Sequence, residues 1–295
     1  MINGALPTDS SSLTIGQCAT LACLLEVSIP KPGNVHRGTD FEDLTLLDFL
    51  ASATAIGPAM DAAIEQPLGK TVLDAITATQ QLVSTNTNLG IVLLIAPLAK
   101  VPRDKSLRDG VRTILADLNE DDAANVYRAI SLANPGGMGS VEEMDIQGPP
   151  PNDLLTAMHA AADRDVVARQ YITDFKEVFE SVIPWLTEAV GSDDLSAGVI
   201  RTHLRLMAHF PDSLIRRKCG ERVAQESADR AAAVLAFGKP GDETYQRALA
   251  DLDFWLRSDG HRRNPGSTAD LIATGLFALL RDGQLRGPTA PSFNR

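Results

Sequence analysis

The chain has 295 residues, of which 44 % are hydrophobic, enough to build a sizeable core in one large domain. Its formal net charge of −11 argues against a general nucleic-acid or anionic-membrane binder, because no overall positive field would attract a polyanion. A small anionic ligand remains compatible with this charge, since it feels only its own pocket. The cysteines Cys18, Cys23 and Cys219 have no metal-binding spacing and indicate free thiols. With no visible signal peptide or spanning run, we expect a cytoplasmic protein that binds neither membrane nor nucleic acid.

Composition and periodicity predict an all-α protein, a single multi-helix globular domain over 1–295 with its core at about 12–282 and frayed termini. Aromatic residues make up only 5 % of the chain, and abundant Ala and Leu cost little entropy in a helix. The first helix, 12–28, should stop before Pro30, because a residue that precedes proline is pushed out of the α region. Helical spacing of apolar residues predicts further helices at 44–65, 69–85, 89–100, 106–118, 120–132, 152–190, 194–209, 214–237, 241–258 and 267–281.

The first polar motif follows the first helix and reads Glu26-Val-Ser-Ile-Pro-Lys-Pro-Gly-Asn-Val-His-Arg37. Its prolines stiffen the chain, and Gly33 lets the backbone approach a ligand closely. The motif predicts an ordered loop whose basic and amide side chains gather phosphate, namely Lys31, Asn34, His36 and Arg37. The alternative is a helix-terminating loop with solvated basic residues.

Two further motifs combine amides with glycines. Asn86-Thr-Asn-Leu-Gly90 precedes an apolar helix, so Asn86, Thr87 and Asn88 are either N-caps or ligands at an anion-binding helix start. Asn134-Pro-Gly-Gly-Met-Gly139 follows a helix. Its backbone N–H groups at Gly136 and Gly137 suit phosphate oxygens, and the alternative is a helix C-cap.

The remaining motifs place carboxylates at helix starts. In Pro211-Asp-Ser-Leu-Ile-Arg-Arg-Lys218, Asp212 or Ser213 either caps the next helix or, for Asp212, binds a metal or a hydroxyl. Of the following basic residues, Arg216, Arg217 and Lys218, one is expected on phosphate, although such a run is usually a solvated face.

Asn264-Pro-Gly-Ser-Thr-Ala-Asp270 has the spacing of a capping box between Ser267 and Asp270. The same helix start, with Asn264 and Gly266, suits a phosphate or a ribose.

The ordered motifs together resemble the triphosphoribosyl-dephospho-CoA synthases, over about residues 15–282. The resemblance implies an all-helical enzyme that moves the 5-triphosphoribosyl group of ATP onto a ribose hydroxyl of dephospho-CoA and releases adenine. Typical members carry Val-Asn-Thr-His-Lys-Gly where this chain has Thr85-Asn-Thr-Asn-Leu-Gly90, and Arg-Gly-Glu where it has Pro135-Gly-Gly-Met-Gly139. These departures indicate a divergent branch and leave the acceptor open between dephospho-CoA and a related cofactor precursor, such as one in one-carbon cofactor synthesis.

Displacement of adenine from ribose passes through an oxocarbenium-like state, for which carboxylates supply a base and stabilise charge. On the motif matches we expect Asp212, Asp270 and Glu26 to be catalytic, with Mg²⁺ on Asp212 and Asp270 beside the phosphates of ATP. The remaining motif residues would bind phosphate or ribose. Three alternatives stay open: a Mg²⁺-dependent N-glycosidase or ADP-ribose hydrolase, a non-catalytic nucleotide-binding protein, and a purely structural helical protein. The expected partners are small nucleotides, with a homo-oligomer as an option.

Overall fold

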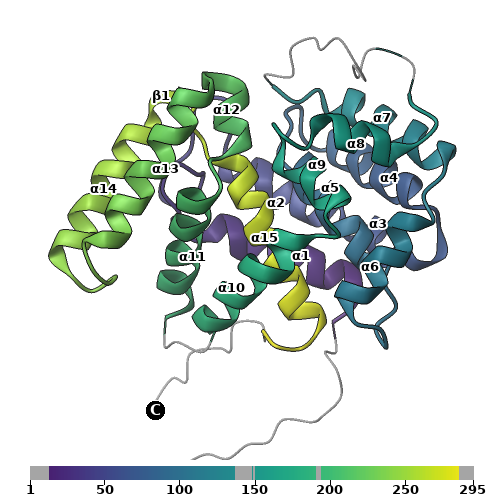
Figure 1. Ribbon diagram of the computed structural model, residues 1–295, viewed down its shortest axis with the longest axis horizontal. Coiled ribbons are helices and arrows are strands. Elements are labelled where there is room, and N and C mark those ends of the chain that lie inside the picture. The colour runs from purple at the N-terminus through teal and green to yellow at the C-terminus, as the bar shows by residue number, and fades with distance from the viewer. Residues whose placement is uncertain (1–12, 137–147, 149, 191–193, 286–295) are drawn as a thin grey trace, which may run out of the picture.

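The computed structural model describes residues 13–136, 148, 150–190 and 194–285 (Figure 1). In these residues the fold is helical, apart from one short extended segment, and the all-α prediction is confirmed. The first half of the chain forms α1 (Ile15–Ser28), α2 (Leu46–Ala55), α3 (Gly57–Asp61), the 3₁₀ turn η1 (Ala63–Glu65), α4 (Leu68–Gln80), α5 (Leu89–Ala99), α6 (Leu107–Ala116) and α7 (Glu120–Ala133).

The second half continues with shorter helices around a long final one. It forms α8 (Leu154–Ala161), α9 (Val166–Ile172), the π-helical turn η2 (Val178–Val182), α10 (Ile183–Val190), α11 (Leu195–His209), α12 (Ser213–Cys219), α13 (Glu221–Ala236), α14 (Glu243–Arg257), the extended segment β1 (Ser258–His261) and α15 (Gly266–Arg281).

Three of the predicted helices were too long, because each is interrupted by residues that end a helix or start a new one. The helix expected at 44–65 divides at Gly57-Pro58, where proline starts α3. The helix expected at 152–190 divides at Asp165, whose side chain caps α9, and again at Asp174 and Phe175, which adopt positive φ angles. The helix expected at 214–237 divides at Gly220, whose φ of 88° ends α12.

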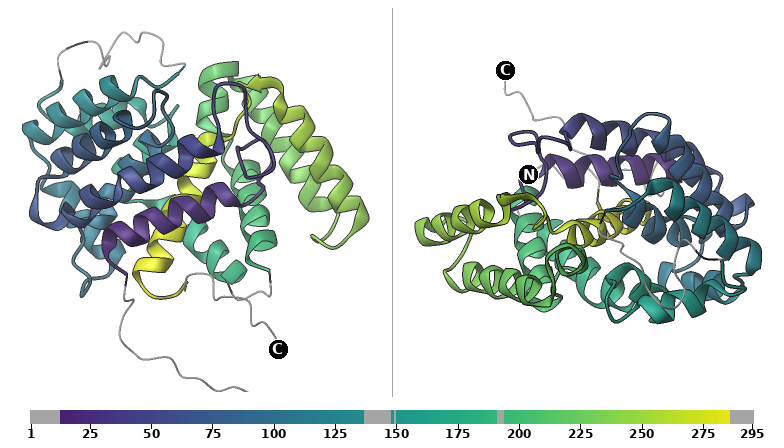
Figure 2. Two further views of the ribbon diagram at one scale, coloured as in Figure 1. Left: turned by 180° about the vertical axis from the view of Figure 1, so that it is seen from behind. Right: turned by 90° about the horizontal axis from the view of Figure 1, so that it is seen from above.

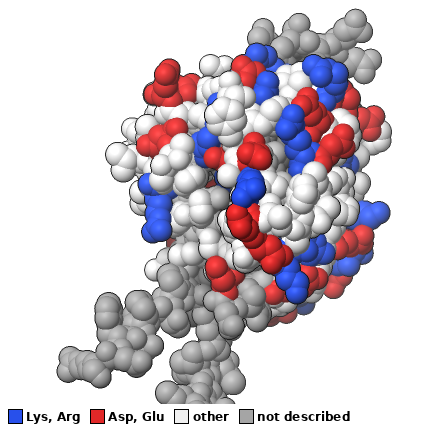
Figure 3. All heavy atoms as spheres, turned by 90° about the vertical axis from the view of Figure 1, so that its left-hand side faces the viewer, with Lys and Arg blue, Asp and Glu red and all other residues white. Residues whose placement is uncertain are grey.

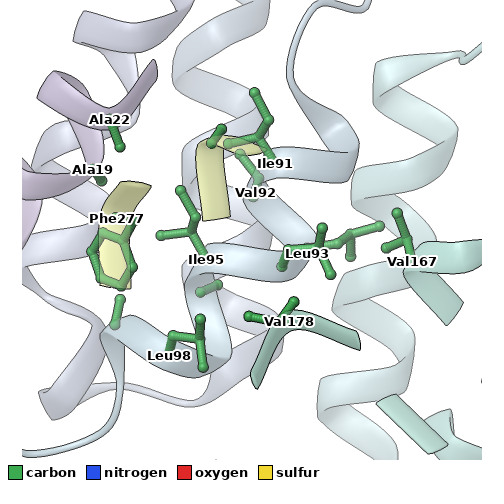
Figure 4. Close-up of a cluster of buried hydrophobic side chains, with 14 of the residues drawn as sticks. Ala19, Ala22, Ile91, Val92, Leu93, Ile95, Leu98, Val167, Val178 and Phe277 are labelled. Atoms are coloured by element: carbon green, nitrogen blue, oxygen red, sulfur yellow. The ribbon is translucent and has the colours of Figure 1, made fainter. Parts of the chain in front are cut away.

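Helices α5 and α15 form the centre of the molecule. Every residue of α5 except Gly90 is buried, and α15 packs against α1, α5, α10 and α11. Figure 2 shows α1 crossing α15 in its left view, and Figure 4 shows side chains from α1, α5, α9, η2 and α15 packed together. Pro97 lies inside α5 and cannot bond the carbonyl of Leu93, but the Tyr171 hydroxyl donates to that carbonyl at 2.7 Å. Tertiary contact therefore satisfies the oxygen that the proline leaves free.

A second hydrophobic cluster lies among α11, α12, α13 and α14, and Ile200 packs against both clusters. On the side of the molecule that is at the left in Figure 1, acidic and basic side chains are interspersed (Figure 3). Pairs such as Arg230–Glu226 and Arg247–Glu243 have the i,i+4 spacing of solvated helix faces. Within the described ranges, no helix has the length and apolar character needed to cross a bilayer.

Candidate active site

A cavity of about 720 Å³ collects residues from motifs that are far apart in the sequence. Its volume is typical of a pocket for a small molecule. The predicted site residues that line it are Glu26, Asn34, Asn86, Thr87, Asn88, Gly136, Ser213, Arg216, Arg217, Asn264, Gly266, Ser267 and Asp270. Five predicted residues do not line it, namely Lys31, Gly33, His36, Arg37 and Asp212, and Gly137 lies outside the described residues.

Asp270 is the carboxylate that the protein leaves most open to a ligand. It projects from α15 against the start of α5, where a Cβ on Gly90 would lie only 2.1 Å from Asp270 Oδ2. No described residue donates a hydrogen bond to its carboxylate or pairs with it, so the capping box predicted with Ser267 does not form. Burial raises the pKa of Asp270 well above its usual value, and the charges of Glu26 and Asp212 add to that shift.

Glu26 faces the cavity from the last turn of α1 and is held from behind by Lys31. The Lys31 ammonium lies 2.8 Å from Glu26 Oε1 and also donates to the backbone carbonyls of Glu26 and Ile29. Lys31 is fully buried and does not line the cavity. The structure therefore gives Lys31 the role of a buried counter-ion, where the sequence predicted a phosphate ligand.

Both carboxylate oxygens of Asp212 accept hydrogen bonds from the first residues of helices. Oδ1 accepts from the N–H groups of Leu214 and Ile215 in α12, and Oδ2 accepts from the N–H and hydroxyl of Thr268 in α15, all at 2.8 to 3.0 Å. A carboxylate offers about four acceptor positions, so these donors fill it. The capping alternative describes Asp212 better than the predicted base or metal ligand, because no acceptor position remains for a substrate.

The neighbouring serines reinforce the same junction. Ser267 Oγ accepts from the Ser213 N–H at 2.9 Å, and Ser213 Oγ accepts from the Val166 N–H at 3.3 Å. Both serines are buried in the cavity wall. Their hydroxyl oxygens thus tie α9, α12 and α15 together, and each hydroxyl retains a hydrogen that it can donate.

In the motif before α5, Asn86 caps the helix, while Thr87 and Asn88 make buried hydrogen bonds. Asn86 Oδ1 accepts from the Leu89 N–H at 3.1 Å, which is the capping alternative. Thr87 shares a short hydrogen bond with Ser52, and Asn88 donates to Thr79 Oγ1 at 3.0 Å. After α7, Asn134 adopts a left-handed conformation at φ 45° and ends that helix, so the C-cap alternative for this motif is confirmed at Asn134.

Basic side chains line another part of the cavity. Arg216 pairs with Glu221 at 2.6 Å, and Arg217 lies 3.5 Å from Asp165. Lys218 also lines the cavity and has no hydrogen-bond or ion-pair partner among the described side chains. Burial lowers its pKa, and repulsion from Arg217 contributes. Arg164, which no sequence motif indicated, lines the cavity too.

The loop after α1 contributes Asn34 to the cavity, whereas Gly33 of the same loop is bonded to α14. The Asn34 amide donates to Asn264 Oδ1 at 2.7 Å, joining two predicted motifs. The Gly33 N–H donates to Asp253 of α14 at 2.7 Å, and a Cβ on Gly33 would lie 2.9 Å from the Leu256 side chain. Gly33 therefore serves loop packing, with a φ of 77°.

The two basic residues at the end of this loop do not line the cavity. His36 is partly exposed, accepts from the Gly38 N–H at 3.1 Å, and has a lowered pKa through burial and the charge of Arg257. Arg37 is exposed. The solvated-loop alternative thus describes His36 and Arg37 better than phosphate binding does.

The described residues hold no group of three His, Cys, Asp or Glu side chains suited to a protein-only metal site. Mg²⁺ at a nucleotide needs only one or two carboxylates, because phosphates and water supply the other ligands. Asp212 does not fit this role, since protein donors fill its oxygens. Glu26 and Asp270 fit it, because each lines the cavity and retains oxygen without a described partner.

Comparisons with known proteins identify the family of this chain. The family model of ATP:dephospho-CoA triphosphoribosyl transferase matches residues 12–288. The crystal structure of a putative triphosphoribosyl-dephospho-CoA synthase from Archaeoglobus fulgidus is similar, at 25% identity and a TM-score of 0.60. That match covers 79% of this chain and 99% of the other. A search of curated proteins finds no match. The chain belongs to the ATP:dephospho-CoA triphosphoribosyl transferase family and is a transferase of that type.

Proposed function

We propose that the cavity transfers the 5-triphosphoribosyl group of ATP to a hydroxyl of dephospho-CoA or a related cofactor precursor, with release of adenine. One observation carries this proposal: the same cavity holds two carboxylates that each keep an oxygen without a described partner, Glu26 and Asp270, and the basic residues Arg164, Arg216, Arg217 and Lys218. Carboxylates suit a developing positive charge on the sugar, and the basic residues suit a polyphosphate. The free cysteines of the described residues support a cytoplasmic setting.

Asp270 serves as the general base in this proposal. It takes the proton of the acceptor hydroxyl as the oxygen forms its bond to ribose C1′. The bond from C1′ to adenine breaks with its electron pair on adenine, which takes up a proton from water, and Asp270 then returns the acceptor's proton to water. The raised pKa makes the Asp270 carboxylate a stronger base than an ordinary carboxylate, which favours proton transfer from the hydroxyl.

Glu26 stabilises the positive charge that develops on the ribose. Lys31 fixes one of its oxygens at 2.8 Å, so the side chain need not reorganise during the reaction. Arg217 and Lys218 are the proposed contacts for the triphosphate, with Arg216 and Arg164 beside them. The amides of Asn34 and Asn264 would orient the ribose.

Mg²⁺ is the expected metal, bound by triphosphate oxygens together with Glu26 or Asp270. It would neutralise phosphate charge and hold the triphosphate in one geometry. Removal of divalent ions with EDTA should abolish adenine release, and added Mg²⁺ should restore it. Full activity in EDTA would remove the metal from the proposal and leave the carboxylate roles unchanged.

The deciding experiment follows adenine release from ATP by chromatography, with and without dephospho-CoA. We expect release to depend on the acceptor, and mass spectrometry should find the triphosphoribosyl group on it in equal amount. Free triphosphoribose without acceptor would instead identify a hydrolase. Intact ATP in the presence of dephospho-CoA and related hydroxyl acceptors would contradict catalysis, provided that ATP binding is measured in the same preparation.

A further inference from the structure

One side of the cavity is apolar and has no use in the transfer chemistry. Six side chains form this apolar lobe: Leu93 from α5, Tyr127 and Ile130 from α7, and Leu154, Ala157 and Met158 from α8. Helix α7 packs on α8, and α5 packs on α9, which lies against α8 (Figure 1). The described lining residues of α5, α7 and α8 carry no charged side chain. The lobe therefore suits an uncharged part of a ligand.

Asn88 supplies an unused hydrogen-bond acceptor at the start of α5. Its side chain is only 4% exposed, it lines the cavity, and its amide oxygen has no partner. Its NH₂ group donates to Thr79 Oγ1 at 3.0 Å, and the Thr79 hydroxyl donates in turn to the Ala75 carbonyl. Thr79 can therefore only accept from Asn88, which fixes the amide orientation and leaves Oδ1 as the free atom. Buried polar atoms are rarely left unpaired, so this oxygen points to a ligand donor.

The positions of the charged residues indicate which part of the cavity binds each of the two substrates. Its described cationic lining residues are Arg164, Arg216, Arg217 and Lys218, which lie on α12 and the α8–α9 connection. The triphosphate of ATP would use them, and departing adenine needs a proton donor at its ring. The apolar lobe has no carboxyl, imidazole or ammonium group to supply that proton.

We propose that the apolar lobe binds the uncharged, amide-bearing arm of the acceptor, with one of its N–H groups donating to Asn88 Oδ1. In dephospho-CoA this part is the pantetheine arm, whose dimethyl group suits the aliphatic wall. The inference rests on the proposed function, because it assigns the acceptor side of the same cavity. It makes Asn88 a specificity residue, apart from the carboxylates that act on the ribose.

The test measures binding of pantetheine and of ATP by calorimetry, which needs no turnover. Ala157→Phe fills the apolar lobe, and Ala160→Phe makes the same change on the exposed face of the same helix. We expect Ala157→Phe to raise the Kd for pantetheine about tenfold or more, because the ring occupies the space of the ligand. Asn88→Ala should raise it about fivefold, the effect of one lost hydrogen bond. Both variants should bind ATP as the wild type does, and Ala160→Phe should bind both ligands normally.

Several results would overturn the inference. If Ala157→Phe weakens ATP and spares pantetheine, the lobe holds the adenine of the donor. If pantetheine fails to bind the wild type, or binds all variants equally, the arm lies elsewhere. Thermal melts of each variant show whether it is folded, and Ala157→Phe and Asn88→Ala test the lobe independently. Failure of the proposed function can be told apart from failure of this inference. In that case the wild type would still bind pantetheine but would leave ATP intact.

Discussion

Asp212 and Asp270 are carboxylates at the starts of two helices that meet beside one cavity, yet their surroundings differ. Asp212 receives hydrogen bonds from α12 and α15, and these fill both of its oxygens. Asp270 lies one helical turn into α15, against a glycine, and receives none from the described residues. Asp212 thus holds the wall together, whereas Asp270 keeps its acceptor capacity for a ligand. A carboxylate in a motif is available for chemistry only if the backbone around it has not already used it.

The same contrast separates two lysines, the buried Lys31 and the partly exposed Lys218. Lys31 is held by Glu26 and two carbonyls behind the wall, while Lys218 lines the cavity and its ammonium has no hydrogen-bond or ion-pair partner among the described residues. Asp270 and Lys218 therefore keep their charged groups available to a ligand, whereas Asp212 and Lys31 are bonded within the protein. Variants of these four residues should separate effects on the reaction from effects on stability.

Asp270→Asn should give the largest effect, a fall in kcat of about 10³-fold, since it removes the proposed base while keeping the shape of the side chain. In the wild type, the pKa of Asp270 is raised in the folded state above its ordinary value of 3.8. The protein therefore loses stability as pH rises above about 3.8, because the unfolded chain ionises this carboxyl more readily than the folded protein does. The free energy of unfolding at neutral pH should consequently not decrease. Steady-state kinetics and urea unfolding measure the two quantities.

Asp251→Asn on the exposed surface of α14 is the matched control, and it should change neither quantity. An Asp270→Asn protein that is folded and releases adenine at the wild-type rate would remove Asp270 from the mechanism.

Lys31→Met should lower the free energy of unfolding by about 3 kcal/mol, because it leaves the buried Glu26 carboxylate without its counter-ion. Lys31→Met combined with Glu26→Gln should recover most of that loss in urea unfolding. The exposed pair Lys70–Asp74 gives the control, since Lys70→Met should cost less than about 0.5 kcal/mol. If Lys31→Met instead weakens ATP binding and leaves stability unchanged, Lys31 is a phosphate ligand after all.

Asp212→Ala should lower the free energy of unfolding by about 2 kcal/mol, through lost caps on two helices and unpaired buried donors. Asp153→Ala removes a cap that serves α8 alone, so about half that loss is expected. The kcat of folded Asp212→Ala should fall far less than that of Asp270→Asn. Equal losses of kcat in the two variants would show that the capping contacts do not exhaust the role of Asp212.

Most of the helices and the motif set could be predicted from the sequence, because apolar spacing and helix-breaking residues are local signals. The break at Gly57-Pro58 was also visible locally, whereas the break at Asp174 and Phe175 depends on packing. The role of Lys31 could not be predicted, and the sequence left the cap and the catalytic role of Asp212 both open, since the outcome depends on which donors and acceptors other helices bring near. The apolar lobe joins α5, α7 and α8 and has no sequence motif at all.

Lys218→Met should raise the Kd for ATP about tenfold, a modest effect because the neighbouring arginines remain. The pKa of Lys218 is lowered from 10.5 by burial and by Arg217, so wild-type ATP binding should weaken as pH rises through the alkaline range below that value. Bound phosphate favours the charged ammonium, so ATP binding should be accompanied by proton uptake there. Lys218→Met should lose this pH dependence, while Lys218→Arg should bind ATP without it because its charge persists. Calorimetry in buffers of different ionisation enthalpy measures the proton uptake, and an unchanged uptake in Lys218→Met would assign it to another group.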